Sequence, residues 1–269
     1  MANAKRVAFF SVKDWHPGMR AFKEQTIEFE WCSEMSWQQP QKSSLSMLHV
    51  LEDLGYIPAE ISRRSVDLDF GVQLSAFNLK LNAVSVENIL QAYKQFNDGG
   101  PYLDLLHVNP KKARNDCRIQ THESKKPCLT HDIEYKNKQF FDDESICVYC
   151  QNRLNRRLIG FTSGKVRWET EPKSMFYDAV YIAALLQNPS QSNRLIEYDA
   201  FTDIEFNQKI EYSKEKGPFN CQARSCAIFT TLKNADYTDE QIAEMVHSPQ
   251  KMKRLYGHFA ESTEQPSFF

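Results

Sequence analysis

An acid, an amide and an amine at helical spacing are the first candidates for chemistry. Glu87, Gln91 and Lys94 stand at positions i, i+4 and i+7, so a helix over 86–96, capped by Ser85, would present them on one face. A carboxylate and an amine that converge on one atom can perform acid–base or nucleophilic catalysis. The commoner origin of such a pattern is a solvated helix face.

The segments on either side of this predicted helix favour a ligand site. Ser75-Ala76-Phe77-Asn78 precedes the helix, and Asp98-Gly99-Gly100-Pro101-Tyr102 follows it. A Gly-Gly turn lets the backbone approach a ligand closely. Together with Gln91, the candidate substrate-binding residues of this region are Asn78, Gly99, Gly100 and Tyr102.

A second set of residues has the spacing of a metal site. Cys128-x2-His131-x15-Cys147-x2-Cys150 matches two metal-binding knuckles, and thiolate and imidazole ligands suit a structural Zn²⁺ ion. We expect Cys128, His131, Cys147 and Cys150 to bind zinc. Cys117 and His122 are rival ligands, and a loop with free thiols is the alternative.

Basic residues gather in and around the same segment. Their clustering in a chain of net charge −2 suggests a phosphate-facing patch that helps to grip DNA; an ordinary solvated surface is the alternative. The residues are Lys111, Lys112, Arg114, Arg118, Lys125, Lys126, Arg153, Arg156 and Arg157.

These residues must be positioned by the helices and strands of the chain. The sequence pattern predicts one helix-dominated α+β domain with a small β-sheet. Its parts are an N-terminal β/α extension (1–65), a catalytic core (66–113 and 158–258) and a Cys/His-rich, zinc-knuckle-like insert (114–157). The sequence predicts strands or extended chain over 7–12, 27–31, 66–81 and 199–206, a hairpin over 158–168, and helices over 43–55, 86–96, 172–187, 219–233 and 239–257.

Composition limits the class of protein. With 269 residues, of which 41% are hydrophobic and 12% aromatic, the chain can build a sizeable core. No run reaches the roughly 18 apolar residues that span a bilayer, and the start lacks a secretory signal. We therefore expect a cytoplasmic protein without a membrane partner.

Several motifs resemble those of the NADAR family. Ser85-Val86-Glu87-x-x-x-Gln91-x-x-Lys94 is similar to the family's Ser-Val-Glu-His-x-x-Gln-x-x-Lys stretch, with Asn88 in place of His. Leu74-Ser75-Ala76-Phe77 resembles its Leu-Ser-Asn-Phe motif, with Ala76 in place of Asn. Further segments resemble one branch of the family, the DarG-type antitoxins associated with DarT toxins. These segments are Glu28-Phe29-Glu30-Trp31, the Gly-Gly segment, the stretch from Tyr198 to Phe206, and Asn220-Cys221-Gln222-Ala223-Arg224.

The resemblance implies a NADAR (YbiA-like) fold and N-glycoside hydrolysis. The substrate it implies is ADP-ribose attached to guanine in DNA by a DarT-type toxin, which is a possible partner; hydrolysis needs no organic cofactor. Glu87 would act as acid or base on the sugar carbon. Lys94 would act as a covalent catalyst through a Schiff base, or electrostatically.

Asp203, Glu205 and Arg224 complete the candidate substrate-binding residues. In an extended chain Asp203 and Glu205 point to the same side, where they could hold ribose hydroxyls or serve as general base; an exposed strand face is equally compatible. Arg224 could bind a pyrophosphate or form a core salt bridge. Two other functions stay open: a non-catalytic module that binds modified nucleic acid or a toxin, and an N-glycosidase acting on a small ribosylated metabolite.

Overall fold

The computed structural model describes residues 2–32, 39–120, 155–172, 174–206 and 221–257. Over these residues the chain forms eight α-helices, two 3-10 helices and three small sheets. The predicted α+β class with a predominance of helices is thereby confirmed. Within the described parts, no helix is both long and apolar enough to cross a bilayer.

The largest sheet joins the N-terminal segment to the second half of the chain. Its strand order is β2-β1-β9-β3. The strands are β1 (Ala2–Phe10), β2 (Lys23–Trp31), β9 (Ala200–Thr202) and β3 (Pro58–Glu60). Helix α1 (Gln39–Asp53) packs against this sheet. It meets Ile27 and Phe29, the two buried residues of the alternating β2 pattern.

A second sheet lies on the opposite side of the molecule. It has the order β6-β7-β8, formed by β6 (Lys94–Phe96), β7 (Leu158–Ser163) and β8 (Val166–Trp168). The hairpin of β7 and β8 confirms the prediction over 158–168. Strands β4 (Lys80–Leu81) and β5 (Val84–Ser85) form a separate two-stranded ribbon.

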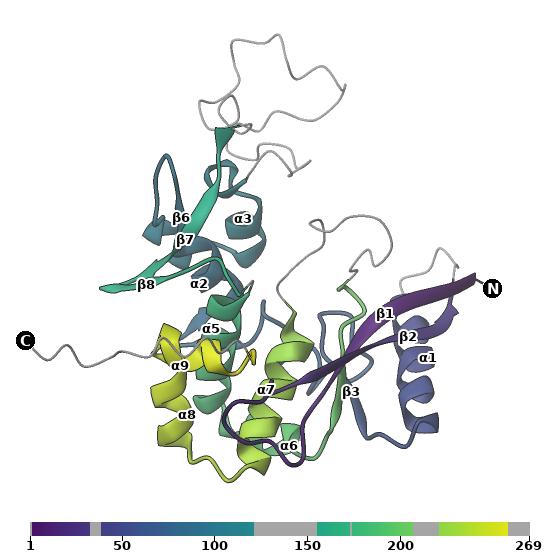
Figure 1. Ribbon diagram of the computed structural model, residues 1–269. Coiled ribbons are helices and arrows are strands. Elements are labelled where there is room, and N and C mark those ends of the chain that lie inside the picture. The colour runs from purple at the N-terminus through teal and green to yellow at the C-terminus, as the bar shows by residue number, and fades with distance from the viewer. Residues whose placement is uncertain (1, 33–38, 121–154, 173, 207–220, 258–269) are drawn as a thin grey trace, which may run out of the picture.

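Buried helices fill the space between the four-stranded and the three-stranded sheet (Figure 1). Helix α2 (Val86–Ala92) contacts α5 (Met175–Leu186), α5 contacts α7 (Gln222–Asn234), and α7 contacts β1 and β9. Every residue of α2 is buried, so it is a core helix with polar residues at its centre. This succession of contacts connects the two sides of the molecule through one core.

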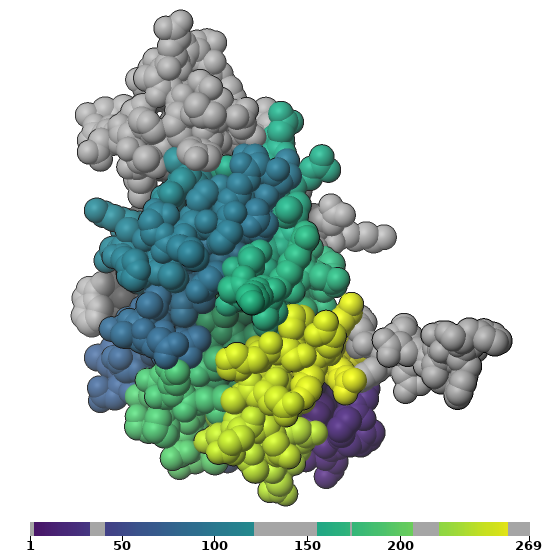
Figure 2. Space-filling model, turned by 90° about the vertical axis from the view of Figure 1, so that its left-hand side faces the viewer, coloured from purple at the N-terminus to yellow at the C-terminus, as the bar shows by residue number. Residues whose placement is uncertain are grey.

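Short helices cover the remaining sides. Beside the second sheet lie η1 (Leu103–His107), α3 (Pro110–Asn115) and η2 (Cys117–Ile119). At the other end are α6 (Pro189–Leu195), α8 (Asp239–Val246) and α9 (Pro249–Arg254). Figure 2 shows the blue-green segments of the second sheet and its neighbours lying above the yellow C-terminal helices.

Three predicted elements differ from the structure, and the first two of them matter for the site. The helix expected over 86–96 ends at Ala92, because Lys94 pairs with Phe161 at the start of β6; the gain from tertiary strand pairing outweighs local helix propensity. The extended chain expected over 66–81 consists mainly of turns. Likewise, the predicted helix over 239–257 is divided into α8 and α9, because Pro249 starts a new helix.

Candidate active site

A pocket of about 170 Å³ lies where α2, α3, α5 and α7 meet the turns that follow β3 and β9. Its lining combines acidic, basic, amide and aromatic side chains, which is the mixture expected of a site for a polar, charged ligand. The lining residues are Arg63, Ala76, Phe77, Glu87, Leu90, Gln91, Arg114, Tyr177, Asp203, Glu205, Phe206 and Gln222.

The first turns of α2 bring Glu87 and Gln91 into the pocket. Ser85 caps the helix by accepting from the Asn88 amide at 3.1 Å. The Glu87 side chain is only 8% exposed; its Oε1 accepts from Gln91 Nε2 at 2.9 Å and lies 3.8 Å from Arg114 Nε. Gln91 Oε1 is buried and has no hydrogen-bond partner within the described parts of the chain. A buried acceptor without a partner is costly, so Gln91 is a place where a bound ligand could donate a hydrogen bond.

The turn after β9 brings two further carboxyl groups to the pocket. Asp203 Oδ1 accepts from the Glu205 amide at 2.9 Å, which folds residues 203–206 into a turn. Asp203 and Glu205 therefore reach the pocket through a turn and not along an extended strand, as the sequence had suggested. Both residues line the same pocket, and their role in binding substrate stays a prediction.

Burial favours the protonated form of Asp203. Burial is the largest cause that raises the pKa of Asp203 well above its ordinary value, and the nearby carboxyl groups of Glu60 and Glu205 add to it. Glu60 lies behind the pocket, almost fully buried, and its pKa is raised to about 7, again chiefly by burial. The raised pKa of Asp203 makes this residue a candidate proton donor in the pocket.

Two arginines and an aromatic ring form the exposed side of the pocket. The Arg63 guanidinium lies 4.3 Å from the centre of the Phe77 ring, and that of Arg114 lies 5.7 Å from the same centre. Arg63 also donates to both carboxylate oxygens of Glu205, at 2.8 and 3.1 Å. Each arginine thus contacts both a pocket carboxylate and the face of Phe77.

Gln222 fixes the loop that carries Phe77. At the start of α7, its Oε1 accepts from the Ala76 amide at 2.9 Å and its Nε2 donates to the Ile61 carbonyl at 2.6 Å. One side chain thereby connects α7, the end of β3 and the 74–79 turns. Gln222 positions the site through these two backbone contacts.

Four of the predicted site residues meet in this pocket: Glu87, Gln91, Asp203 and Glu205. Lys94 is not among the lining residues, because it belongs to β6 and does not continue the face of α2. The expected arrangement of Glu87 and Lys94 on one helical face is therefore wrong. Whether Lys94 takes part in the reaction stays a prediction.

Arg224 forms an ion pair in the core of the protein. Its Nε donates to Asp178 Oδ2 at 2.9 Å and its Nη2 to Oδ1 at 3.3 Å. Ser225 and Tyr256 donate to the same carboxylate. The core salt bridge, one of the two roles that the sequence left open for Arg224, is the one found, and Arg224 does not line the pocket.

The remaining predicted binding residues also lie outside the pocket lining. Asn78 is exposed and donates from Nδ2 to the Val72 carbonyl at 2.9 Å, closing a turn. Gly99 and Gly100 adopt positive φ angles beside β6, and a Cβ on Gly100 would lie 2.3 Å from the Lys94 carbonyl oxygen. The Gly-Gly turn thus permits close approach to another strand rather than to a ligand in this pocket.

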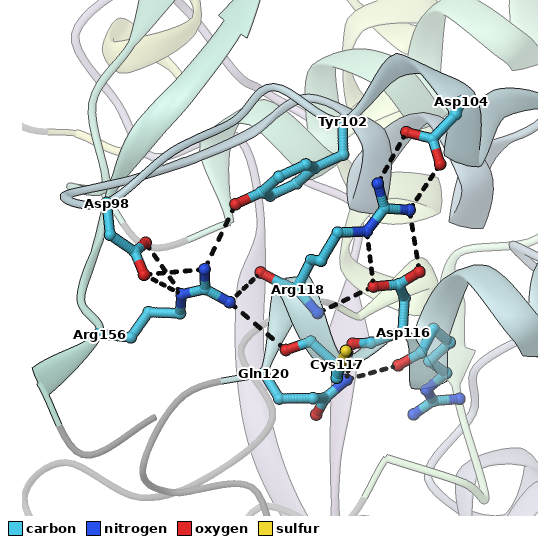
Figure 3. Close-up of polar contacts among 9 residues, drawn as sticks. Asp98, Tyr102, Asp104, Asp116, Cys117, Arg118, Gln120 and Arg156 are labelled. Atoms are coloured by element: carbon cyan, nitrogen blue, oxygen red, sulfur yellow. Dashed lines mark hydrogen bonds and ion pairs between the residues drawn. The ribbon is translucent and has the colours of Figure 1, made fainter. Parts of the chain in front are cut away.

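Tyr102 belongs to a separate cluster of ion pairs, shown in Figure 3. Its hydroxyl accepts from Arg156 Nη2 at 3.4 Å, while Arg156 Nε also donates to Asp98 at 2.9 Å. Arg118 pairs with Asp104 and Asp116 in the same cluster. Two of the basic residues assigned to a phosphate-facing patch, Arg118 and Arg156, are therefore engaged with carboxylates of the protein.

Asn88, which replaces the family's His, also points away from the pocket lining. It is buried, and its Nδ2 donates to the carbonyls of Leu105 and Val108 at 2.6 and 2.9 Å. Its Oδ1 accepts from the Ser85 hydroxyl at 2.5 Å. Asn88 therefore fastens the 103–108 segment to α2 and has a positioning role.

Sequence reasoning missed Arg63, Phe77, Tyr177 and Gln222 as site residues, and it named Arg114 only within the basic cluster. Phe77 and Gln222 both stand in motifs that carried the family resemblance, which was a usable signal. Arg63 and Tyr177 come from distant parts of the chain, and no local pattern marks them. Tyr177 is placed by the packing of α5 against α2, and Arg63 follows β3, which pairs with β9.

The predicted zinc ligands, Cys128, His131, Cys147 and Cys150, lie outside the described residues. The described residues contain no cluster of three or more His, Cys, Asp or Glu side chains suited to a metal. Cys117, the described rival ligand, is buried in η2. The zinc site stays a prediction.

The fold and the site define an α+β protein with a carboxylate-lined pocket, and comparison with known families identifies its family. The family described as DarT1-associated NADAR antitoxin matches residues 4–143 and 148–266. The chain therefore belongs to that family, and the match includes most of the segment expected to be an insert. None of the curated proteins compared with the chain matches it.

Proposed function

We propose that this protein is an N-glycosidase that removes ADP-ribose from guanine bases in DNA and so reverses the action of a DarT-type toxin. Membership of the antitoxin family supports the toxin as the opposing partner. The observation that carries the proposal is the presence of Glu87 and Asp203, both nearly buried, in the lining of one pocket. Paired carboxyl groups catalyse O-glycoside hydrolysis through an oxocarbenium-like sugar carbon, and cleavage of an N-glycosidic bond develops the same charge on that carbon.

The two carboxyl groups divide the chemistry between them. As the bond between C1″ and the guanine nitrogen breaks, its electron pair stays on the base, which takes a proton from Asp203. The sugar carbon becomes positively charged, and the Glu87 carboxylate stabilises it. A water molecule then adds to C1″ and returns a proton to Asp203, which completes the cycle. General acid catalysis of this kind contributes about 10²–10⁴-fold.

Lys94 offers a different, covalent route to hydrolysis, and a separate experiment tests it. A lysine that attacks C1″ displaces the base and, with the opened sugar, forms a Schiff base that water later hydrolyses. Sodium borohydride reduces such an intermediate to a stable adduct of protein and ADP-ribose. An adduct that disappears in Lys94→Arg assigns Lys94 the covalent role; hydrolysis without an adduct assigns the reaction to the carboxyl groups alone.

The central experiment measures release of ADP-ribose from ADP-ribosylated guanine in DNA. The wild-type protein should release it, and Glu87→Gln and Asp203→Asn should each lose at least about a hundredfold in rate. Glu197→Gln, at an exposed position away from the pocket, is the matched control and should retain full activity. Binding of the modified DNA without release supports the non-catalytic module, and release only from a small ribosylated metabolite supports the other alternative.

A further inference from the structure

We propose that Arg63, Arg114 and Phe77 form a subsite for the diphosphate group of the substrate at the exposed side of the pocket. The inference rests on the proposed function, since it places one end of the sugar nucleotide whose other end is hydrolysed. Arginine suits this role because its planar guanidinium offers five donors in a fork that matches phosphate oxygens. One arginine can therefore serve a phosphate and a carboxylate together.

The pocket has a gradient from exposed cations to buried carboxyl groups. The side chains of Arg63 and Arg114 are 39% and 47% exposed, whereas that of Glu87 is 8% exposed. A ligand with an anionic end and a sugar end would be oriented by this arrangement. Its phosphates would meet the arginines near solvent, and its sugar carbon would lie deeper, beside Glu87.

Phe77 holds the two arginines in place before a ligand arrives. Both guanidinium groups lie within cation–π distance of its ring, at 4.3 and 5.7 Å. Phe77 itself is carried by the loop that Gln222 fixes through the Ala76 amide. A guanidinium that is already oriented loses less conformational entropy when it binds an anion.

The present partners of the arginines are themselves pocket carboxylates. Arg114 Nε lies 3.8 Å from Glu87 Oε1. At this distance the two groups form an ion pair but no hydrogen bond. A phosphate that draws Arg114 toward itself would weaken this contact. The negative charge of Glu87 would then act on the sugar carbon, so binding of the diphosphate and readiness for the reaction become coupled.

Phosphates from two sources could meet these arginines: the diphosphate of ADP-ribose and the DNA backbone. The contact of Arg114 with Glu87 favours the diphosphate, because that group is linked to the same ribose on which Glu87 acts. An arginine that served the DNA backbone would have no need of a position beside the carboxylate of the pocket. The experiment therefore measures the two ligands separately.

The test is calorimetric binding of free ADP-ribose and, in a second arm, of unmodified duplex DNA. Arg63→Gln and Arg114→Gln should each bind ADP-ribose roughly tenfold or more weakly than wild type, as expected when a charged hydrogen bond is lost. Adenosine, which lacks phosphate, should show no such difference. Arg114→Lys, which keeps the charge, should recover part of the affinity, and circular dichroism confirms that each variant is folded.

Arg64→Gln is the matched control. Arg64 follows Arg63 and also pairs with Glu205, at 3.4 Å, but it does not line the pocket. Its affinity for ADP-ribose should stay within twofold of wild type. Equal ADP-ribose binding by all variants overturns the inference, as does a loss confined to the DNA arm. A protein that binds ADP-ribose as predicted but releases none from DNA retains the subsite and refutes the proposed hydrolysis.

Discussion

Glu60 is a buried acid, and its burial disfavours the charged form of the carboxyl group. Its Oε1 accepts from the Ile204 amide at 3.0 Å, while its Oε2 is buried without a hydrogen-bond partner among the described residues. Burial raises its pKa from the ordinary 4.5 to about 7. A carboxyl group with a raised folded-state pKa takes up a proton on folding, so its stabilisation is complete below pH 4.5 and is lost as pH rises through about 7.

Glu60→Gln should therefore remove a pH dependence of stability. Glutamine retains the acceptor for Ile204 but cannot ionise. Between pH 5 and 8, the free energy of unfolding of wild type should fall relative to the variant by about 2–3 kcal/mol, from about 1.4 kcal/mol per pH unit of displacement. Urea unfolding at both pH values measures this. Glu52→Gln, at an exposed position in α1, should show no such difference, and the same result for Glu60→Gln would contradict the assignment.

Asp203 should set the alkaline limit of activity. Since burial raises its pKa and the proposed reaction uses its proton, kcat/KM for ADP-ribose release should decline as pH rises through that pKa. Asp203→Asn should lose about 10²–10⁴-fold in rate and with it the alkaline decline. A variant that keeps the wild-type pH profile at reduced rate would show that another group supplies the proton.

At the scale of elements, the sequence predicted several residues of the pocket lining but not the end of helix α2. Periodicity predicted the first two turns of α2, and Glu87 and Gln91 follow from them. It could not predict that Lys94 leaves the helix, because that depends on pairing with β7, more than sixty residues later. The same limit explains Arg63, which reaches the pocket only because β3 pairs with β9.

The sequence singled out Asp203 and Glu205 by their residue types, but the backbone geometry predicted for them differs from the structure. Asp203 and Glu205 were grouped on the assumption of an extended chain, whereas an Asp203 side chain that accepts from the Glu205 amide forms a turn. Both residues nevertheless line the pocket, within a stretch that resembles the family. Arg224 shows the opposite case, since its position in a shared motif reflects a core ion pair with Asp178.

Asn88 should stabilise the junction of α2 with the 103–108 segment. Asn88→Ala leaves the buried carbonyl of Leu105 and the partly buried carbonyl of Val108 without these donors, so it should cost about 2–3 kcal/mol in the free energy of unfolding. Chemical denaturation measures the loss. Asn78→Ala, which removes one hydrogen bond at an exposed turn, should cost less than about 1 kcal/mol; equal effects of the two variants would contradict this account.

At the scale of the whole molecule, the zinc prediction concerns Cys128, His131, Cys147 and Cys150, which lie outside the described residues. Two Cys/His pairs fifteen residues apart predict one equivalent of zinc in the purified protein. Elemental analysis should find it, and Cys147→Ser should lose it. Less than about half an equivalent in wild type, together with unchanged stability of Cys147→Ser, would exclude a structural zinc site.

The cluster around Arg156 joins parts of the chain that are distant in sequence. The Arg156 side chain is fully buried and donates to Asp98 and to the carbonyls of Cys117 and Arg118 (Figure 3). It thus ties the start of β7 to the turn after β6 and to η2. Because Phe96 and Ile119 pack in one hydrophobic cluster with Ala92, these ion pairs lie beside the C-terminal end of α2.

Arg156→Met should destabilise the whole protein, because methionine fills similar space but leaves Asp98 and two carbonyls without their donor. Removing one partner of a buried ion pair costs about 3–5 kcal/mol, and since the Asp98 side chain is 34% exposed, we expect the lower part of that range. Arg157→Met, at the exposed neighbouring position, should change the free energy of unfolding by less than about 0.5 kcal/mol. Adding Asp98→Asn to Arg156→Met should cost less than the same change in wild type, because the charge it removes has already lost its partner. Additive effects in this double-mutant cycle would mean that Arg156 and Asp98 do not act as a unit.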